Sequence, residues 1–196
     1  YDPFAFNLRH LRAMATIVRL GSLSAAAQAV GITQPALTAA IAGLERQLGV
    51  LFMRSRAGMA ATPAGAMLAA RVEEAYAHLA AGLSLNGPAN RGFSKPEQLI
   101  TTAQLRALLA LADQGSYVAS AQQTGLSEPA LHRSVRDIER LTGTALVKRR
   151  GRGVALTPAG RSAARAFRFA FRALRSGLAE LGALADADAP DRLVVG

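Results

Sequence analysis

The feature that most constrains this sequence is an internal repeat, in which the second half of the chain follows the first at a nearly constant offset. Matched segments recur 94 or 95 residues apart: LRA at 11–13 and 105–107, PAL at 35–37 and 129–131, and TPAG at 62–65 and 157–160. Gly and Pro positions rarely coincide by chance over so long a register. The sequence therefore predicts a duplicated domain, with one residue inserted late in the second copy.

Composition indicates the fold class that the two copies share. Hydrophobic residues make up 51% of the chain, but only 5% is aromatic and there is no Trp, so the core must consist mainly of Ala, Leu and Val. Sequence rich in Ala and Leu favours helix, which predicts a mainly α protein.

A linker between the two copies is marked by Gly87-Pro88 and Lys95-Pro96. We expect a first domain at 1–86, a linker at 87–98, a second domain at 99–188, and the start of a further domain at 189–196.

Each copy contains helices separated by glycine. In the first copy, one helix ends before Gly21, and Ser22 is a suitable N-cap for a short helix over 23–30 that Gly31 ends. Thr33 then caps a third helix. The second copy repeats this order with Gly115-Ser116, Gly125 and Ser127. Two helices joined by a glycine turn are typical of a helix-turn-helix unit, although an ordinary helical hairpin has the same pattern.

The segment after each third helix favours the helix-turn-helix interpretation. A short apolar stretch, a basic turn that contains glycine and a second short stretch come before each Thr-Pro. This pattern predicts a two-stranded wing beside a recognition helix. Cations at the tip of such a wing are placed for phosphate or minor-groove contact, although a solvated charged turn would have the same composition.

The charge balance indicates the class of partner. The chain has 23 Lys and Arg against 13 Asp and Glu, a net charge of +10 and a pI near 11.4. This charge predicts an anionic partner, most commonly nucleic acid; a solubilising charge and an acidic membrane surface are the alternatives.

The absence of Cys excludes disulfides, thiolate catalysis and Cys-based zinc sites. The lack of Cys also fits a reducing cytoplasm, and we expect a cytoplasmic protein whose partner is not a membrane. No apolar run reaches the roughly 18–20 residues needed to span a bilayer.

An ordered set of motifs runs through both copies. The first copy has GSLSAAA at 21–27, TQPALT at 33–38, Ile41, Leu44-Glu45, LGV at 48–50, LFMR at 51–54 and TPAG at 62–65. The second has GSY at 115–117, SEPAL at 127–131, Ile138-Glu139 and LTPAG at 156–160. In this order the motifs resemble the LysR-type transcriptional regulator family. The resemblance implies a winged helix-turn-helix domain, a long linker helix used for dimerisation, a C-terminal effector-binding domain, and control of transcription through sequence-specific binding to double-stranded DNA.

The resemblance, the outward helix faces and the wing pattern together give a set of candidate DNA-contact residues. In the first copy these are Thr33, Gln34, Pro35, Thr38, Arg54 and Arg56. In the second copy they are Ser127, Glu128, Pro129, His132, Arg133, Arg136, Lys148, Arg149, Arg150 and Arg152. We expect Lys148 to occupy the position that Arg54 has in the first copy.

The second copy departs from the family pattern at Glu128, where the family usually has Gln. An ionised Glu can only accept hydrogen bonds, for example from cytosine N4, and it repels nearby phosphates. The second copy is therefore expected to read a different sequence or to bind DNA less specifically. The duplication also departs from the family, which normally has one such domain per chain.

Beyond each Thr-Pro the sequence predicts a long helix with an apolar seam. The seam residues are Val72, Tyr76, Leu79 and Leu83 in the first copy, and Phe167, Phe171, Leu174, Leu178 and Leu181 in the second. A seam with this heptad-like spacing needs a partner helix. Our hypothesis is that the two long helices of one chain pair to form a pseudo-dimer. The alternatives are a homodimer and a seam that packs on its own domain.

We expect neither enzymatic activity nor a cofactor or metal in this fragment. His10, His78 and His132 are far apart in the sequence, the carboxylates form no recognisable pair with a nucleophile, and no phosphate-binding glycine loop is present. A small-molecule effector is expected for the C-terminal domain that the resemblance implies.

The alternative to DNA binding by both copies is that one winged-helix copy serves dimerisation or protein contact without base readout.

Overall fold

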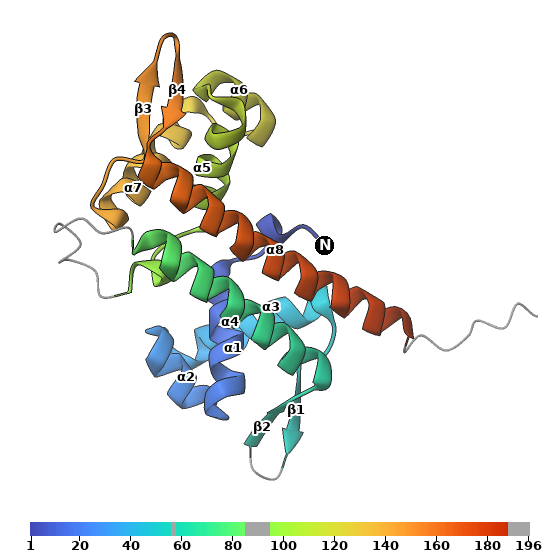
Figure 1. Ribbon diagram of the computed structural model, residues 1–196. Helices are drawn as coiled ribbons and strands as arrows, with labels where there is room; N and C mark the ends of the chain where they lie inside the picture. Colours follow the sequence, from blue (N-terminus) through green and yellow to red (C-terminus); the bar gives the residue numbers. More distant parts are fainter. Residues whose placement is uncertain (56–57, 85–94, 188–196) are drawn as a thin grey trace, which may run out of the picture. The chain divides into compact units, whose positions relative to one another are not determined.

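A computed structural model describes residues 1–55, 58–84 and 95–187, and it confirms the mainly α fold (Figure 1). Two winged helix-turn-helix modules follow one another along the chain, and a long helix follows each module. Among the described residues, no helix combines the length and apolar character that crossing a membrane requires.

The first module has three helices and a two-stranded antiparallel wing. A short 3-10 helix, η1 (Pro3–Ala5), comes before them. The elements that follow are α1 (Leu8–Leu20), α2 (Leu23–Val30), α3 (Gln34–Leu48), β1 (Phe52–Ser55), β2 (Gly58–Ala61) and the long helix α4 (Pro63–Leu83). Helix α2 covers the predicted range of 23–30.

The second module repeats this order. After the short helix η3 (Pro96–Gln98) come α5 (Thr102–Gln114), α6 (Tyr117–Thr124), α7 (Glu128–Thr142), β3 (Val147–Arg150), β4 (Gly153–Leu156) and the long helix α8 (Pro158–Ala187). The duplicated order that the sequence repeat predicts is therefore confirmed.

Local capping explains where the short helices begin and end. The Ser22 hydroxyl accepts a hydrogen bond from the Ala25 amide at 3.2 Å, which satisfies one of the free N–H groups at the start of α2. Gly31 ends α2 in the left-handed conformation, with φ of 70°, which glycine adopts without a Cβ clash. In the second module Ser116 and Gly125 have the same two roles around α6.

Thr-Pro-Ala-Gly joins each wing to its long helix through the same contacts. The Thr62 amide donates to the Leu51 carbonyl at 2.9 Å, and the Thr62 hydroxyl accepts from the Gly65 amide at 3.0 Å. A Cβ atom at residue 65 would overlap the Leu51 carbonyl oxygen, so this position requires glycine. In the second copy Thr157 and Gly160 make the equivalent contacts with Leu146. The repeated motif therefore fixes where each long helix leaves its wing.

The seams of the long helices are buried, as the heptad-like spacing predicts. The fully buried seam residues are Val72, Leu79, Leu83, Phe167, Phe171, Leu174, Leu178 and Leu181. Tyr76 is half-buried, and its hydroxyl donates to the Leu8 carbonyl at 2.9 Å. The amphipathic Tyr side chain therefore packs its ring and keeps its polar end hydrogen-bonded.

The contacts divide the chain into two compact units, and the division cuts both long helices. The first unit combines Tyr1–Pro3 and Arg9–Glu73 with α8 from Ala173 onward, and the second combines Phe4–Leu8 with Glu74–Arg172. Each unit thus contains one module, part of α4 and part of α8. These units differ from the boundaries at 86 and 99 that the sequence suggests, because both long helices are shared. Residues 87–94 of the predicted linker, and the predicted domain start at 189–196, lie outside the described residues.

Within each unit the two long helices are in close contact at a glycine. In the first unit a Cβ atom at Gly177 of α8 would lie 2.8 Å from the Arg71 Cβ atom of α4. In the second unit a Cβ atom at Gly82 of α4 would lie 2.8 Å from the Ala166 Cβ atom of α8. In the first unit Arg71 also donates to the Glu180 Oε1 atom, from Nη2 at 2.6 Å and from Nε at 3.1 Å.

Candidate nucleic-acid interface

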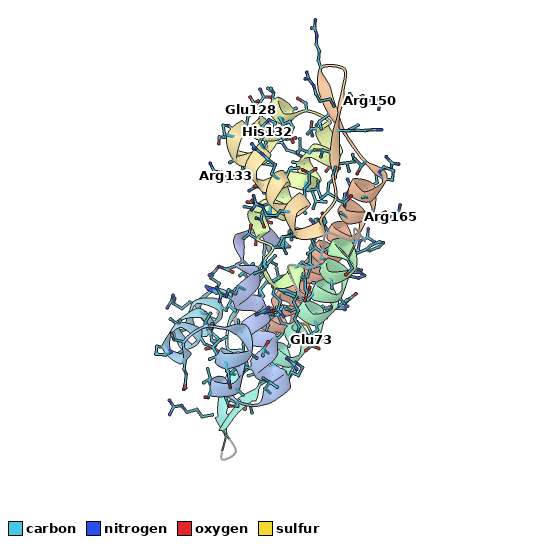
Figure 2. All side chains as sticks on the ribbon, turned by 90° about the vertical axis from the view of Figure 1, so that its left-hand side faces the viewer. Glu73, Glu128, His132, Arg133, Arg150 and Arg165 are labelled. Carbon is cyan, nitrogen blue, oxygen red and sulfur yellow. The ribbon has the colours of Figure 1, made fainter. Side chains whose placement is uncertain are left out.

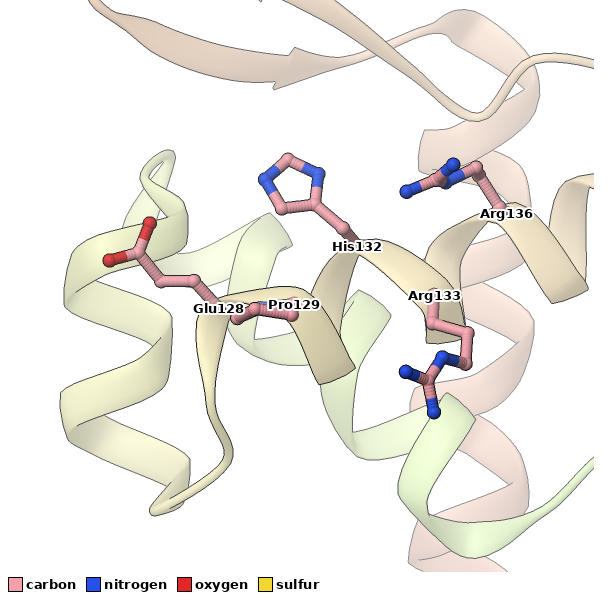
Figure 3. Close-up of a pocket in the computed structure, with 5 residues that line it drawn as sticks. All are labelled: Glu128, Pro129, His132, Arg133 and Arg136. Atoms are coloured by element: carbon pink, nitrogen blue, oxygen red, sulfur yellow. The ribbon is translucent and has the colours of Figure 1, made fainter.

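Helix α7 presents one apolar face to its module and one charged face to solvent. Leu131, Val135 and Ile138 are buried, whereas the candidate contact residues are exposed. Figure 3 shows Glu128, Pro129, His132, Arg133 and Arg136, which together line a surface hollow along α7. His132 and Arg136 project toward the strands of the wing, and Arg133 projects the other way. The charged face therefore begins at the first turn, which is the part of a recognition helix that reaches base edges.

The His132 ring is held by a stacking contact that the sequence analysis did not predict. It lies on the Tyr117 ring of α6, with 3.6 Å between ring centroids and 19° between the ring planes. Burial raises the pKa of the Tyr117 phenol above its usual value, the Glu139 carboxylate raises it further, and Arg136 opposes the shift. The phenol is therefore neutral at physiological pH and offers a flat surface that orients the imidazole.

Helix α3 presents a face without charge at the matching positions. Gln34, Thr38, Ala39 and Ala42 are all exposed, above a buried stripe that includes Leu37. The Thr38 hydroxyl donates to the Gln34 carbonyl at 3.0 Å. This bond uses the hydroxyl proton and leaves the oxygen lone pairs and the methyl group of Thr38 available to a ligand.

The two wings share the same strand pairing but differ in charge and in their position relative to the sequence repeat. Arg54 of β1 pairs across the wing with Met59, and Arg149 of β3 pairs with Val154. Arg149 is therefore the structural equivalent of Arg54, and the expected equivalence of Lys148 with Arg54 is wrong. The reason is that two residues, Thr144 and Ala145, stand where the first module has only Val50.

In both wings, the cationic side chains that the structure describes are exposed to solvent. Arg54 is exposed in the first module, and Arg56 lies outside the described residues. The exposed cations of the second wing are Lys148, Arg149, Arg150 and Arg152. Figure 2 shows Arg150 on the wing, and Glu128 and His132 on α7 of the same module.

A second hollow lies between the α6–α7 corner and the wing of the second module. Tyr117, Glu128 and His132 line one side of it. Lys148, Arg149 and Arg152 line the other. Within this unit the structure thus brings together the acidic start of α7, the stacked imidazole and the cationic wing.

Each wing is braced to its recognition helix by a glutamate that the sequence analysis did not identify as a site residue. The Glu45 Oε1 atom accepts from the amides of Leu51 and Phe52, both at 3.0 Å. In the second module the Glu139 Oε1 atom accepts from the amides of Leu146 and Val147. The internal repeat contained a signal for this role. Glu-Arg recurs at 45–46 and 139–140, although most of the outward-facing residues of the two recognition helices differ.

Every candidate contact residue in the described part of the chain is exposed. Thr33 and Ser127 also have a structural role, because their hydroxyls accept from the amides of Ala36 and Ala130 and cap the recognition helices. The candidate residues form two separate surfaces, one on each module, and each is made of a helix face and a wing.

Comparisons with known proteins agree with this architecture. The model of the family described as bacterial regulatory helix-turn-helix proteins, lysR family, matches residues 8–66 and again residues 102–161. The HTH-type transcriptional regulator GalR of Pseudomonas putida is 32% identical over 170 residues, which cover 86% of this chain and 42% of that protein. That alignment is too long to be confined to one of the two copies.

Other relatives match over shorter regions. The HTH-type transcriptional regulator CbbR of Sinorhizobium medicae is 50% identical over 60 residues, 30% of this chain and 19% of that protein. TdcA of Escherichia coli, also named an HTH-type transcriptional regulator, is 39% identical over 66 residues, 33% of this chain and 21% of that protein. No solved structure matches the chain. The chain spans less than half the length of each of these relatives. Because the two family matches together cover more than half of its residues, the chain belongs to the lysR family of bacterial regulatory helix-turn-helix proteins.

Proposed function

We propose that this chain is a cytoplasmic transcriptional regulator that binds double-stranded DNA sequence-specifically through both of its winged helix-turn-helix modules. One observation carries the proposal: each module pairs an exposed, N-capped recognition helix with an exposed basic wing. Helix α3 or α7 would enter the major groove, and the wing cations would contact the flanking backbone or minor groove. The net charge of +10 supports an anionic partner.

Footprinting on genomic fragments tests sequence-specific binding. We expect the 196-residue chain to protect discrete sites in the presence of excess nonspecific competitor DNA and at about 200 mM salt. Specific base contacts survive these conditions, whereas binding through phosphates alone falls steeply with salt concentration. Protection that is diffuse and disappears on addition of salt would contradict the proposal.

We also propose that the two long helices make the chain an intrachain pseudo-dimer. The close approaches at Gly82 and Gly177 support this arrangement, because each brings α4 and α8 together within a unit. The Arg71–Glu180 ion pair supports it further in the first unit. A single polypeptide would then carry the two DNA-binding surfaces that a dimer carries on two chains.

Solution scattering and sedimentation on dilute protein test the pseudo-dimer. We expect a compact particle with the mass of one chain and a mass that does not change on further dilution. An extended two-bead monomer, or a dimer that dissociates into such monomers, would show that the long helices need a second chain.

The alternative function, in which one module makes only protein contacts, is favoured by one observation in the first module. Its recognition-helix surface at Thr38, Ala39 and Ala42 has no charge. Substituting alanine at Gln34 and Arg54 in one variant, and at Glu128 and Arg150 in another, separates the two functions. If both modules read DNA, each variant loses affinity for the duplex, whereas a purely structural module tolerates its own substitutions.

A further inference from the structure

We propose that the two modules read chemically different half-sites, so that the operator is asymmetric. The first module would read a half-site rich in A·T pairs, and the second would read one that contains C·G and G·C pairs. This inference rests on the proposed function and adds the identity of the bases that each module selects.

The internal repeat supplies the comparison that carries the inference. Residues that hold the modules together are retained with their contacts, including the caps, the Glu45 and Glu139 braces and the Thr-Pro-Ala-Gly motif. Four exposed positions of the recognition helices differ: Gln34 and Glu128, Thr38 and His132, Ala39 and Arg133, and Ala42 and Arg136. The two modules therefore share one scaffold but differ in the side chains that would face the DNA groove. They can contact different base pairs from equivalent positions.

The face of the first module suits A·T pairs. The Gln34 amide can both donate and accept, as bidentate recognition of adenine N6 and N7 requires. The methyl groups of Thr38, Ala39 and Ala42 offer apolar contact to the thymine methyl group. None of these side chains has the charged donors that favour guanine.

The face of the second module suits C·G and G·C pairs. The exposed Glu128 carboxylate can only accept, which matches the cytosine N4 amino group. Arg133 and Arg136 offer paired donors for guanine O6 and N7. His132, oriented by its stack on Tyr117, lies between Glu128 and Arg136 on the same helix face.

The surroundings of Glu128 show how a carboxylate can be tolerated near DNA. In the described part of the chain it makes no ion pair, so its negative charge is available to a ligand. Lys148, Arg149 and Arg152 line the opposite side of the same hollow and offset the repulsion between this carboxylate and phosphate. Only a base that donates a hydrogen bond to Glu128 offsets the cost of desolvating it, so the carboxylate disfavours bases without an amino donor.

Selection of bound duplexes from a random DNA pool by the 196-residue chain tests the inference. We expect a site with two unlike halves, one dominated by A·T pairs and the other containing C·G and G·C pairs, about one helical turn or a multiple of it apart. Enrichment of two like half-sites would overturn this inference and leave the proposed function standing. Failure to enrich any sequence would overturn the proposed function itself.

Substitutions then assign each half to its module. Glu128→Gln should relax or change the preference at one base pair of the C·G-containing half by roughly 5- to 150-fold and leave the other half unchanged. Gln34→Glu is the matched control and should alter only the A·T-rich half. A change in the opposite half, or in neither half, would overturn the assignment.

Exchanging the whole face is the strongest form of the test. A chain with Glu128→Gln, His132→Thr, Arg133→Ala and Arg136→Ala has the face of the first module on both scaffolds. All four positions are exposed, so the melting temperature should stay within a few degrees of the parent value. The selected site should become two like, A·T-rich halves. Retention of an asymmetric site by this folded variant would overturn the inference.

Discussion

At the scale of single residues, the placement of each wing depends on one carboxylate. Glu45 lies in the second half of α3 and accepts hydrogen bonds from two backbone amides at the start of the wing, and Glu139 does the same between α7 and the second wing. A carboxylate oxygen that accepts two backbone N–H groups makes charge-assisted bonds, which are stronger than neutral ones. These residues act on DNA only through the wing, so they are positioning residues.

Glu139→Ala should lower the free energy of unfolding by about 2 kcal/mol, because the amides of Leu146 and Val147 lose a charged acceptor. Denaturant titration measures the change. Glu73→Ala is the matched control: its ion pair with Arg19 is exposed and 4.0 Å long, so the effect should stay below about 0.5 kcal/mol. Equal effects of the two substitutions would contradict the bracing role.

Gly65→Ala should destabilise the chain by about 2 kcal/mol or more, because the added Cβ atom would overlap the Leu51 carbonyl oxygen. Gly43→Ala makes the same change within a helix where the nearest atom is 3.7 Å away, at the end of the Arg46 side chain. This control should be neutral or stabilising by up to about 1 kcal/mol. Thermal unfolding of the two variants compares them, and a tolerated Gly65→Ala would refute the packing account of the motif.

At the scale of elements, helix and strand positions could be predicted because their signals are local. Ser22 and Gly31 mark the ends of α2 within a single turn, and α2 covers the predicted residues. The residues of β3 that match those of β1 were harder to predict. Thr144 and Ala145 stand where the first copy has one residue, so β3 is shifted by one position relative to the earlier part of the repeat. The Tyr117–His132 stack joins two helices through side-chain geometry, which a linear pattern does not contain.

The wing of the second module should supply a large share of the salt-dependent affinity. Replacing Lys148, Arg149 and Arg152 with Gln should reduce the slope of log K against log salt by up to about 3, or about 1 for each lost phosphate contact. The affinity should fall by a similar factor on specific and nonspecific duplexes, as measured by fluorescence anisotropy at several salt concentrations. Arg175→Gln on α8 is the control for net charge, and a slope that falls equally with it would mean that the wing has no special role.

At the scale of the whole molecule, the proposed pseudo-dimer depends on how the two long helices pack. The sequence predicted their seams, but which helix covers each seam depends on packing between residues about 100 positions apart, as between Arg71 and Glu180. The division into compact units follows the same packing, so boundaries drawn along the sequence do not match it.

Gly82→Leu and Gly177→Leu should each weaken the pairing of α4 with α8, because either side chain would push against atoms less than 3 Å from the new Cβ position. Overpacking of this kind costs about 1–3 kcal/mol, and calorimetry should record a lower melting temperature. Gly182→Leu is the matched control, because nothing lies within 4 Å of its added Cβ atom. If the control lowers the melting temperature as much as the other two variants, the close approaches do not stabilise the protein.

The stoichiometry and footprint of the DNA complex test the central claim most directly. Native mass spectrometry of the chain on a selected duplex, combined with hydroxyl-radical footprinting of the same complex, measures both. The account predicts one chain per duplex and two protected patches about one helical turn, or a multiple of it, apart. One chain protecting a single patch, or two chains sharing one site, would contradict it.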